Sequence, residues 1–337
     1  MTDPTPLPVP GATPLPTDAD NLPEGLRPND LDPAVESAMA AYLASLGLRP
    51  FDGPGAPEQF YAYVQESLGT PRCNVIENAR QKRGIEGTAR LADDIVFYEL
   101  FGDEPTARAL HSTRYDYFLQ TGPRVAALLP QTGRVVDLGC NTGVLTNYYA
   151  QERPELEILG LDRVPQPLKI ARREAQQRSL KNVKYDTADA LRLIPSRNAD
   201  MIISTTTFWR QVVLPPQGLR VYAAQTTSIN RARILQQLPF FRYNASVLAT
   251  ILKSLKLGGT LILMERLPDN LNAEALRLLL RLAGFKDLAF ETVIARDEGK
   301  RQAFGLLTLE KQEPPTDDTA ALADDPEAPR EDAVPTT

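Results

Sequence analysis

An aspartate and two glycines stand close together where a short apolar run ends, in VVDLGCNTGVLT at residues 135–146. Gly139 and Gly143 lie where a predicted strand turns into a predicted helix, and glycine there allows positive φ and a close approach of the backbone to a ligand. Asp137 ends the strand, and its carboxylate suits a ligand with a positive group rather than a pyrophosphate. The dinucleotide pattern G-x-G-x-x-G fails, because positions 139, 141 and 144 read Gly, Asn and Val.

Two further acids follow the next two apolar runs. Asp162 ends LEILGLD, and a carboxylate at the end of a second strand can accept hydrogen bonds from both hydroxyls of a ribose. Asp189 ends the third run, in TADAL, where an acid beside a small residue suits an adenine amino group. The three acids therefore favour a ligand with a ribose, an adenine and a positive group.

The elements that must position these acids are strands alternating with helices. Seven strands are predicted, at 133–140, 156–162, 182–189, 199–207, 258–266, 287–295 and 302–310. Apolar-periodic stretches separate the first six, which predicts an α/β fold with a mostly parallel sheet covered on both faces and a hairpin of the last two strands. Such a sheet binds ligands at the carboxyl ends of its first strands.

The region before the sheet is predicted to be entirely helical. Helical spacing of apolar residues recurs at 34–48, 57–69, 92–102 and 105–120. We expect a helical N-terminal region at 34–130, which caps the site, and a sheet domain at 131–311.

The acidity of the chain belongs to its ends. Residues 1–50 carry 2 Lys/Arg and 7 Asp/Glu, and residues 311–337 carry 2 and 8, although the whole 337-residue chain has a net charge of −6. The ends are also rich in proline, so they bury too little apolar surface to offset the entropy of ordering. We predict disordered acidic tails at 1–33 and 312–337.

Composition excludes several classes of protein. No apolar run reaches the roughly 18–20 residues of a membrane helix, and the start resembles no secretory signal. Two cysteines and a single histidine provide neither a disulfide framework nor a zinc site. We expect a cytoplasmic protein with no metal centre and no membrane partner.

The order DLGCNTG, LGLDRV, TADALRLIPSRNADMIIS, LKLGGTLILMER and LAGF is similar to the class I S-adenosylmethionine-dependent methyltransferases, over about residues 105–310. This resemblance implies a Rossmann-like sheet, S-adenosylmethionine as cofactor, and methyl transfer. The residues that it implies for the cofactor's methionine end are Asp137, Gly139, Cys140, Asn141 and Gly143. Those that it implies for the ribose and adenine are Asp162, Arg163 or Val164, Asp189 and Ala190, and those near the sulfonium are Ser204 and Thr205.

Several residues are candidates for the acceptor side. A helix before the first strand often covers the cofactor site in this family, so the resemblance makes His111 and Tyr115 candidate bases or aligning groups; on one helix they would share a face with Arg108. Glu265, at the end of the fifth strand, is a further candidate. Trp209 and Arg210 should face the acceptor, because they follow the fourth strand.

A long stretch without acids points to the kind of acceptor. Between Asp200 and Glu265 there is no acidic residue, but there are seven Lys/Arg. Within it, about 208–245 looks like an insertion over the cofactor mouth in which aromatic residues interleave with arginines. It could clamp an anionic or aromatic acceptor, offer a surface to RNA, or form a lid with no substrate role.

The function expected first is methyl transfer to a small acceptor, anionic or aromatic. The segment after the fourth strand, STTTFW, lacks the NPPY of amide and adenine methyltransferases. Residues 51–310 carry a net charge of only +5, which argues against a nucleic acid as the acceptor. The alternatives are an RNA or protein methyltransferase, a non-catalytic cofactor-binding scaffold, and aminopropyl transfer on the same fold.

Overall fold

A single seven-stranded sheet forms the centre of the computed structural model. The structure describes residues 31–51, 56–83, 91–188, 198–208, 248–266, 283–297 and 300–312, with positions 273, 276, 277 and 279–281. The strands are β1 (Gly133–Leu138), β2 (Leu156–Asp162), β3 (Val183–Thr187), β4 (Ala199–Thr205), β5 (Leu255–Arg266), β6 (Phe285–Asp297) and β7 (Lys300–Lys311). The helices are α1 (Pro33–Ser45), α2 (Ala56–Arg83), α3 (Leu91–Glu99), η2 (Leu100–Gly102), α4 (Glu104–Ser112), α5 (Tyr115–Leu128), α6 (Val144–Glu152) and α7 (Pro165–Gln177).

The strand order is β3-β2-β1-β4-β5-β7-β6. Strands β1 to β5 pair in parallel, and β7 is antiparallel to both of its neighbours. The fold class predicted from sequence is therefore confirmed, including the hairpin of the last two strands. Because β1 and β4 are adjacent while the chain crosses over between them, their carboxyl ends flank a topological switch point, where α/β sheets bind ligands.

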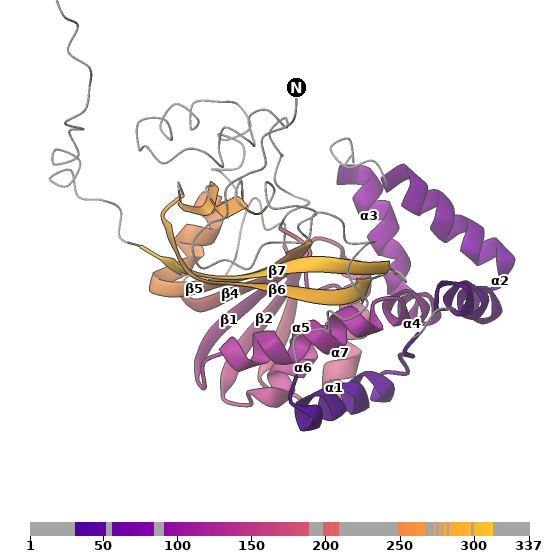
Figure 1. Cartoon of the computed structure of the whole chain (residues 1–337), viewed down its shortest axis with the longest axis horizontal. Coiled ribbons are helices and arrows are strands. Elements are labelled where there is room, and N and C mark those ends of the chain that lie inside the picture. Colours follow the sequence, from indigo (N-terminus) through magenta and orange to yellow (C-terminus); the bar gives the residue numbers. More distant parts are fainter. Residues whose placement is uncertain are drawn as a thin grey trace, which may run out of the picture.

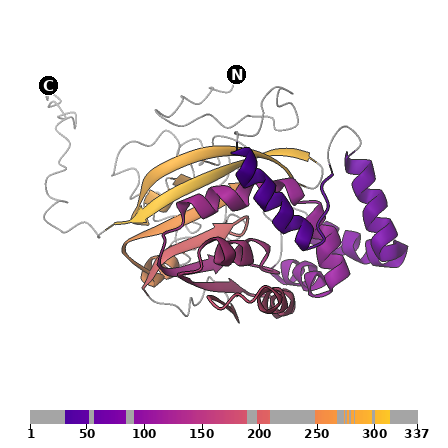
Figure 2. The same ribbon diagram turned by 90° about the horizontal axis from the view of Figure 1, so that it is seen from below.

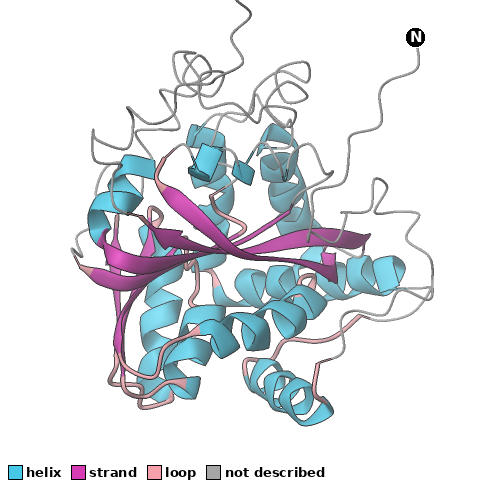
Figure 3. Cartoon of the chain, turned by 60° about the vertical axis from the view of Figure 1, so that its left-hand side comes forward, coloured by secondary structure: helices cyan, strands magenta, loops and turns pink. Residues whose placement is uncertain are grey.

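Two apolar cores cover the two faces of the sheet, and Figure 3 shows helices on both sides of it. Val135 of β1 and Ile203 of β4 belong to the core that also contains residues of α1, α5, α6 and α7. Their neighbours Val136 and Ile202 belong to the other core, with Leu248 and other residues of the helical stretch 248–254. This alternation follows from the two-residue period of a strand, and it gives the strands the near-continuous apolar sequences of a doubly covered sheet.

The N-terminal region contains helices and no strand among its described residues. Figures 1 and 2 show α2, α3 and α4 grouped at one end of the sheet, while α5 lies along one face. Phe97 and Phe101 pack in a small core with Leu110 of α4 and Ile170 of α7. The helical cap is thus attached to the sheet domain by apolar packing, on the side where β1 and β2 end.

Two predicted boundaries are wrong. The single helix expected at 105–120 is two helices, because α4 ends at Ser112 and α5 begins at Tyr115. The hydroxyls of Ser112 and Thr113 bond back to the carbonyls of Arg108 and Leu110, at 2.8 Å each, which competes with helix continuation. The strand predicted at 258–266 begins earlier, because β5 starts at Leu255, which pairs with Ala199.

Other predictions lie outside the described residues. These predictions concern most of the two tails, Asp189 and Ala190, and all of the expected insertion at about 208–245 except Phe208. Trp209 and Arg210 lie there as well.

Candidate cofactor site

The turn between β1 and α6 has the backbone that its glycines suggest. Gly139 and Gly143 have φ of 77° and 75°, and Asn141 has φ of 51°. A Cβ on Gly139 would collide with the side chain of Thr207, so only glycine fits this position as the structure stands. The N–H groups of Gly139 and Cys140 both donate to the carbonyl of Leu161, at 2.7 and 3.1 Å, which fixes the turn against the end of β2.

Asp137 is a buried carboxylate at the base of this turn. Its Oδ2 accepts a hydrogen bond of 2.6 Å from Oγ1 of Thr146, while its Oδ1 has no hydrogen-bond partner among the described residues. Burial raises the pKa of Asp137 to about 6, opposed by the Thr146 hydrogen bond and reinforced by the nearby charge of Asp162. A buried acceptor without a donor is costly, so this oxygen fits the positive group of a ligand.

Asp162 ends β2 and holds the same turn from the other side. Its Oδ2 accepts from the backbone N–H of Asn141 and its Oδ1 from that of Val164, both at 2.9 Å. Burial raises its pKa, and these two hydrogen bonds oppose the shift. Each oxygen keeps lone-pair capacity for a further donor such as a ribose hydroxyl.

A cavity opens over these residues and holds about 1010 Å³ of free space, the solvent at its mouth included. Its sheet side, among the described residues, is formed by Asp137, Gly139, Cys140, Asn141, Thr142, Val144, Leu145, Leu161, Asp162, Arg163, Ala188 and Thr205–Thr207. Its cap side is formed by Asp94, Tyr98, Phe101, His111, Arg114, Tyr117 and Phe118. The cavity therefore joins the predicted cofactor turn to an aromatic wall supplied by α3, η2, α4 and α5.

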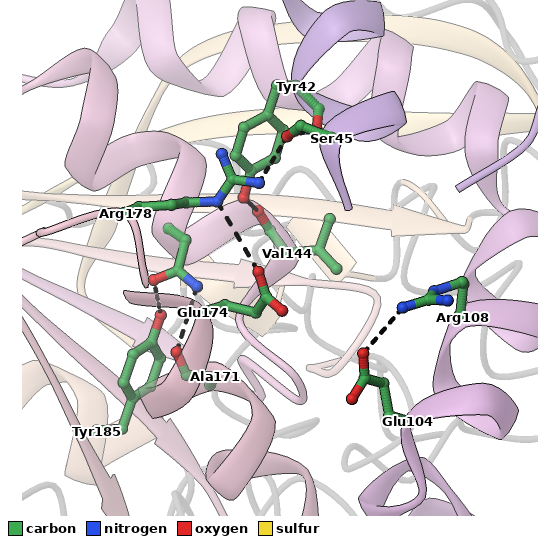
Figure 4. Close-up of polar contacts among 10 residues, drawn as sticks. Tyr42, Ser45, Glu104, Arg108, Val144, Ala171, Glu174, Arg178 and Tyr185 are labelled. Atoms are coloured by element: carbon green, nitrogen blue, oxygen red, sulfur yellow. Dashed lines mark hydrogen bonds and ion pairs between the residues drawn. The ribbon is translucent and has the colours of Figure 1, made fainter. Parts of the chain in front are cut away.

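A layer of polar contacts supports the start of α6 from behind (Figure 4). The hydroxyl of Tyr42, on α1, donates to the carbonyl of Val144 at 2.6 Å. The hydroxyl of Tyr185, on β3, donates to Oδ1 of Asn147 at 2.6 Å, and the amide of Asn147 donates to the carbonyl of Ala171 at 3.4 Å. Helix α6 is thus fixed to α1, β3 and α7, so the glycine turn before it has a rigid support.

His111 contacts the cofactor turn directly. Its Nε2 lies 2.6 Å from Oγ1 of Thr142, and its ring packs between those of Phe101 and Phe118. Burial, aided by the positive charge of Arg114, lowers the pKa of His111 to about 3. A neutral imidazole whose conjugate acid is this strong is a poor base near pH 7. The structure therefore favours a positioning role for His111.

Tyr115 lies apart from the cavity. The break between α4 and α5 turns it toward Phe51 and Phe60, beside Arg296. Its neighbour Arg114 takes the place at the cavity wall instead.

The end of β4 forms a further part of the cavity wall. Thr205, Thr206 and Thr207 line the cavity, whereas Ser204 is buried within the sheet and does not. Glu265 lies beneath this turn, and its Oε1 accepts from the N–H groups of Thr207 and Phe208, at 3.2 and 2.8 Å. Glu265 thus supports the turn that follows β4.

Most of the cofactor residues expected from sequence meet at this one cavity. The cap-side residues, other than His111, were not anticipated. Arg114 is fixed by Asp297, 183 residues away, through a 2.9 Å ion pair. The only available signal was the run RYDYF at 114–118, which mixes a cation with aromatic residues.

Comparisons with known proteins point to the methyltransferases. A family model described as a methyltransferase domain matches residues 131–279. Trans-aconitate 2-methyltransferase of Methylobacterium nodulans is 32% identical over 156 residues, which are 46% of each chain. Release factor glutamine methyltransferase of Escherichia coli is 35% identical over 80 residues, 24% of this chain and 29% of that protein. An uncharacterized RNA methyltransferase of Bacillus cereus is 26% identical over 147 residues, 41% of this chain and 31% of that protein.

The chain spans less than half the length of each of these relatives. A solved SAM-dependent methyltransferase from Aquifex aeolicus superposes with a TM-score of 0.39 at 16% identity, over 56% of this chain and 89% of that chain. The matched residues 131–279 thus form a methyltransferase domain that shares the strand order and motif order of the class I S-adenosylmethionine-dependent methyltransferases, whose cofactor is S-adenosylmethionine.

The residues present fit this cofactor. The unpartnered Oδ1 of Asp137 suits its ammonium group, the glycine turn borders the cavity where its methionine end would lie, and Asp162 suits its ribose. Arg163 lines the cavity beside Asp162, with a buried Nη1 that lacks a partner among the described residues. The residues that the structure describes contain no cluster of side chains that could hold a metal ion. None of the helices among them combines the length and apolarity of a membrane span.

Proposed function

We propose that this protein transfers the methyl group of S-adenosylmethionine to a small anionic acceptor. The observation that carries the proposal is the shared cavity: the cofactor turn forms one wall, and aromatic rings with Arg114 and Asp94 form the other. An enclosed wall of this kind suits a small molecule better than an extended chain.

The chemistry needs alignment more than it needs a catalytic group. Bound cofactor supplies a methyl group activated by the positive sulfonium, and displacement at that carbon requires the acceptor atom in line with the bond that breaks. In this protein the turn at Thr205–Thr207 and the rings of Tyr117 and Phe118 line the same cavity as Asp137. They are placed to orient an acceptor and to exclude water.

The protonation states of the cap-side groups favour an acceptor that is already ionised. His111 stays neutral as a weak base, and burial raises the pKa of Tyr117 to about 12. Neither group is suited to removing a proton near pH 7. A carboxylate needs no base to accept a methyl group, so this class of acceptor agrees with the site.

Among the relatives, the name trans-aconitate 2-methyltransferase also describes an enzyme for a small carboxylic acid. The release factor and RNA methyltransferases match shorter shares of their own length. They make a protein or an RNA the second candidate for the acceptor.

The test is transfer of radiolabelled methyl groups from S-adenosylmethionine to three kinds of acceptor: small carboxylic acids including trans-aconitate, purified release factor, and ribosomal RNA. We expect label in the small-acid fraction only, and none with an Asp162→Ala variant. Label in protein or RNA alone would show that the acceptor is a protein or an RNA and not a small acid. Cofactor binding without transfer to any of the three would support the scaffold alternative.

A further inference from the structure

Three side chains that could donate hydrogen bonds meet at the acceptor end of the cavity. Nη2 of Arg114 donates to Oγ1 of Thr206 at 3.2 Å, and its guanidinium carbon lies 4.3 Å from the centre of the Tyr117 ring. All three residues line the cavity. They come from the start of α5 and the end of β4, so the fold brings them together from distant parts of the chain.

The orientation of the Arg114 guanidinium is fixed by its other partners. Its Nε donates to Oδ1 of Asp297 at 2.9 Å, at the end of β6. That end is held in turn by Asp116, which accepts from the N–H of Arg296 at 2.6 Å. A guanidinium held at one edge and stacked on a ring loses little further freedom when it binds a planar anion.

Thr206 has a backbone that its side chain disfavours. Its φ is 55°, which is exceptional for a β-branched residue. Its N–H donates to the carbonyl of Met264 at 2.7 Å, and the next two N–H groups are held by Glu265. Strain kept in place by several contacts is typical of functional sites, and here it places a hydroxyl at the cavity wall beside Arg114.

Tyr117 has a buried hydroxyl with no hydrogen-bond partner among the described residues. The residue is 1% exposed. Burial raises the pKa of Tyr117, and the neighbouring side chain of Thr206 opposes this shift. A buried hydroxyl in this position is suited to donate to a ligand in the cavity.

The charges around the three donors are balanced in favour of an anion once the cofactor is bound. Asp297 and Glu265 are the nearby acids, and neither lines the cavity. Asp297 lies behind the guanidinium, and Glu265 accepts from backbone N–H groups beneath the turn. Arg114 is therefore the charged group in contact with the other two donors, while the lining carboxylates Asp94, Asp137 and Asp162 belong to other parts of the cavity wall. The sulfonium of bound cofactor would add a second positive charge.

We propose that Arg114, Tyr117 and Thr206 form a subsite that binds a carboxylate of the acceptor. This rests on the proposed function, because it assigns the residues that select the acceptor in the same cavity. A carboxylate has two oxygens with about four lone-pair directions, which match one guanidinium and two hydroxyls.

The test is calorimetric titration of the full chain, with and without saturating S-adenosylhomocysteine. The probes are trans-aconitate and 4-hydroxybenzoate, each beside a neutral counterpart, the trimethyl ester and the amide. We expect at least one carboxylate to bind, and at least tenfold more tightly than its counterpart. Arg114→Gln should weaken binding of that carboxylate at least tenfold, and Tyr117→Phe should weaken it at least fivefold. Both variants should bind S-adenosylhomocysteine within twofold of the wild type.

Matched variants separate a subsite from a general effect on the fold. Tyr149 is also fully buried with an unpartnered hydroxyl, but it does not line the cavity, so Tyr149→Phe should leave carboxylate binding unchanged. Thr206→Ser should keep binding within twofold, because it keeps the hydroxyl, whereas Thr206→Val should not.

Three results would overturn the subsite: no carboxylate binds under either condition, the neutral counterparts bind as tightly, or the Arg114 and Tyr117 variants bind like the wild type. Failure of the wild type to bind S-adenosylhomocysteine would contradict the proposed function instead. The titrations without it would still decide the subsite.

Discussion

The imidazole of His111 and the hydroxyl of Thr142 lie 2.6 Å apart and join the helical cap to the cofactor turn. One partner belongs to α4, and the other lies in the turn between β1 and α6. Because both are buried, any change in the charge of His111 acts on the turn that we assign to the cofactor.

His111 should make folding stability depend on pH in the mildly acidic range. Its pKa is lowered to about 3 in the folded chain, so the unfolded chain takes up a proton below about pH 6.5 while the folded chain does not. Stability contributed by the neutral form is therefore lost as pH falls. The loss between pH 7.5 and pH 5 is about 2 kcal/mol.

The measurement is urea unfolding of the wild type and of His111→Gln at both pH values. The advantage of the wild type over the variant should shrink by about 2 kcal/mol on acidification. Asp137, whose folded pKa of about 6 acts in the opposite direction, is present in both chains and cancels in this comparison. An advantage that does not change with pH would show that the imidazole is not held neutral.

Asp137 should make cofactor affinity depend on pH. Its pKa of about 6 means that most of the carboxylate is protonated at pH 5 and ionised at pH 7.5. If its unpartnered oxygen binds the ammonium group, affinity for S-adenosylmethionine falls about tenfold over that range. Calorimetry at the two pH values should show this fall for the wild type and its loss in Asp137→Asn. The same fall in both chains would assign it to another group.

Gly139 should tolerate a side chain less well than a glycine with the same backbone elsewhere. Gly139 and Gly258 have φ of 77° and 70°, but a Cβ on Gly258 meets nothing within 4 Å. Gly258→Ala should cost about 1 to 2 kcal/mol through its φ alone. Gly139→Ala should cost about 1 to 3 kcal/mol more, because the methyl group meets Thr207. Equal losses in urea unfolding would mean that Thr207 moves aside freely.

The sheet and the cofactor wall could be read from the sequence because they depend on local patterns. Apolar runs that end in Asp137 and Asp162 define two strand ends, and parallel strands bring those ends to one edge. The glycine turn needs only its own residues to adopt positive φ. These features were predicted in the right places because each is encoded within a few residues.

The acceptor wall could not be predicted in the same way, because distant contacts form it. Arg114 reaches the cavity only because hydroxyl contacts end α4 at Ser112, and Asp297 then fixes its guanidinium. The left-handed Thr206 depends on Met264 and Glu265 of the neighbouring strand. No spacing rule within one segment indicates such pairings.

The central claim is that the cavity at the ends of β1 and β2 binds S-adenosylmethionine through Asp162. We would titrate the wild type, Asp162→Ala and Asp186→Ala with the cofactor by calorimetry. Asp186 is an exposed acid one residue before the end of β3, outside the cavity lining. We expect micromolar binding to the wild type and to Asp186→Ala, weakened roughly tenfold or more in Asp162→Ala. No binding to the wild type, or equal binding to all three chains, would contradict it.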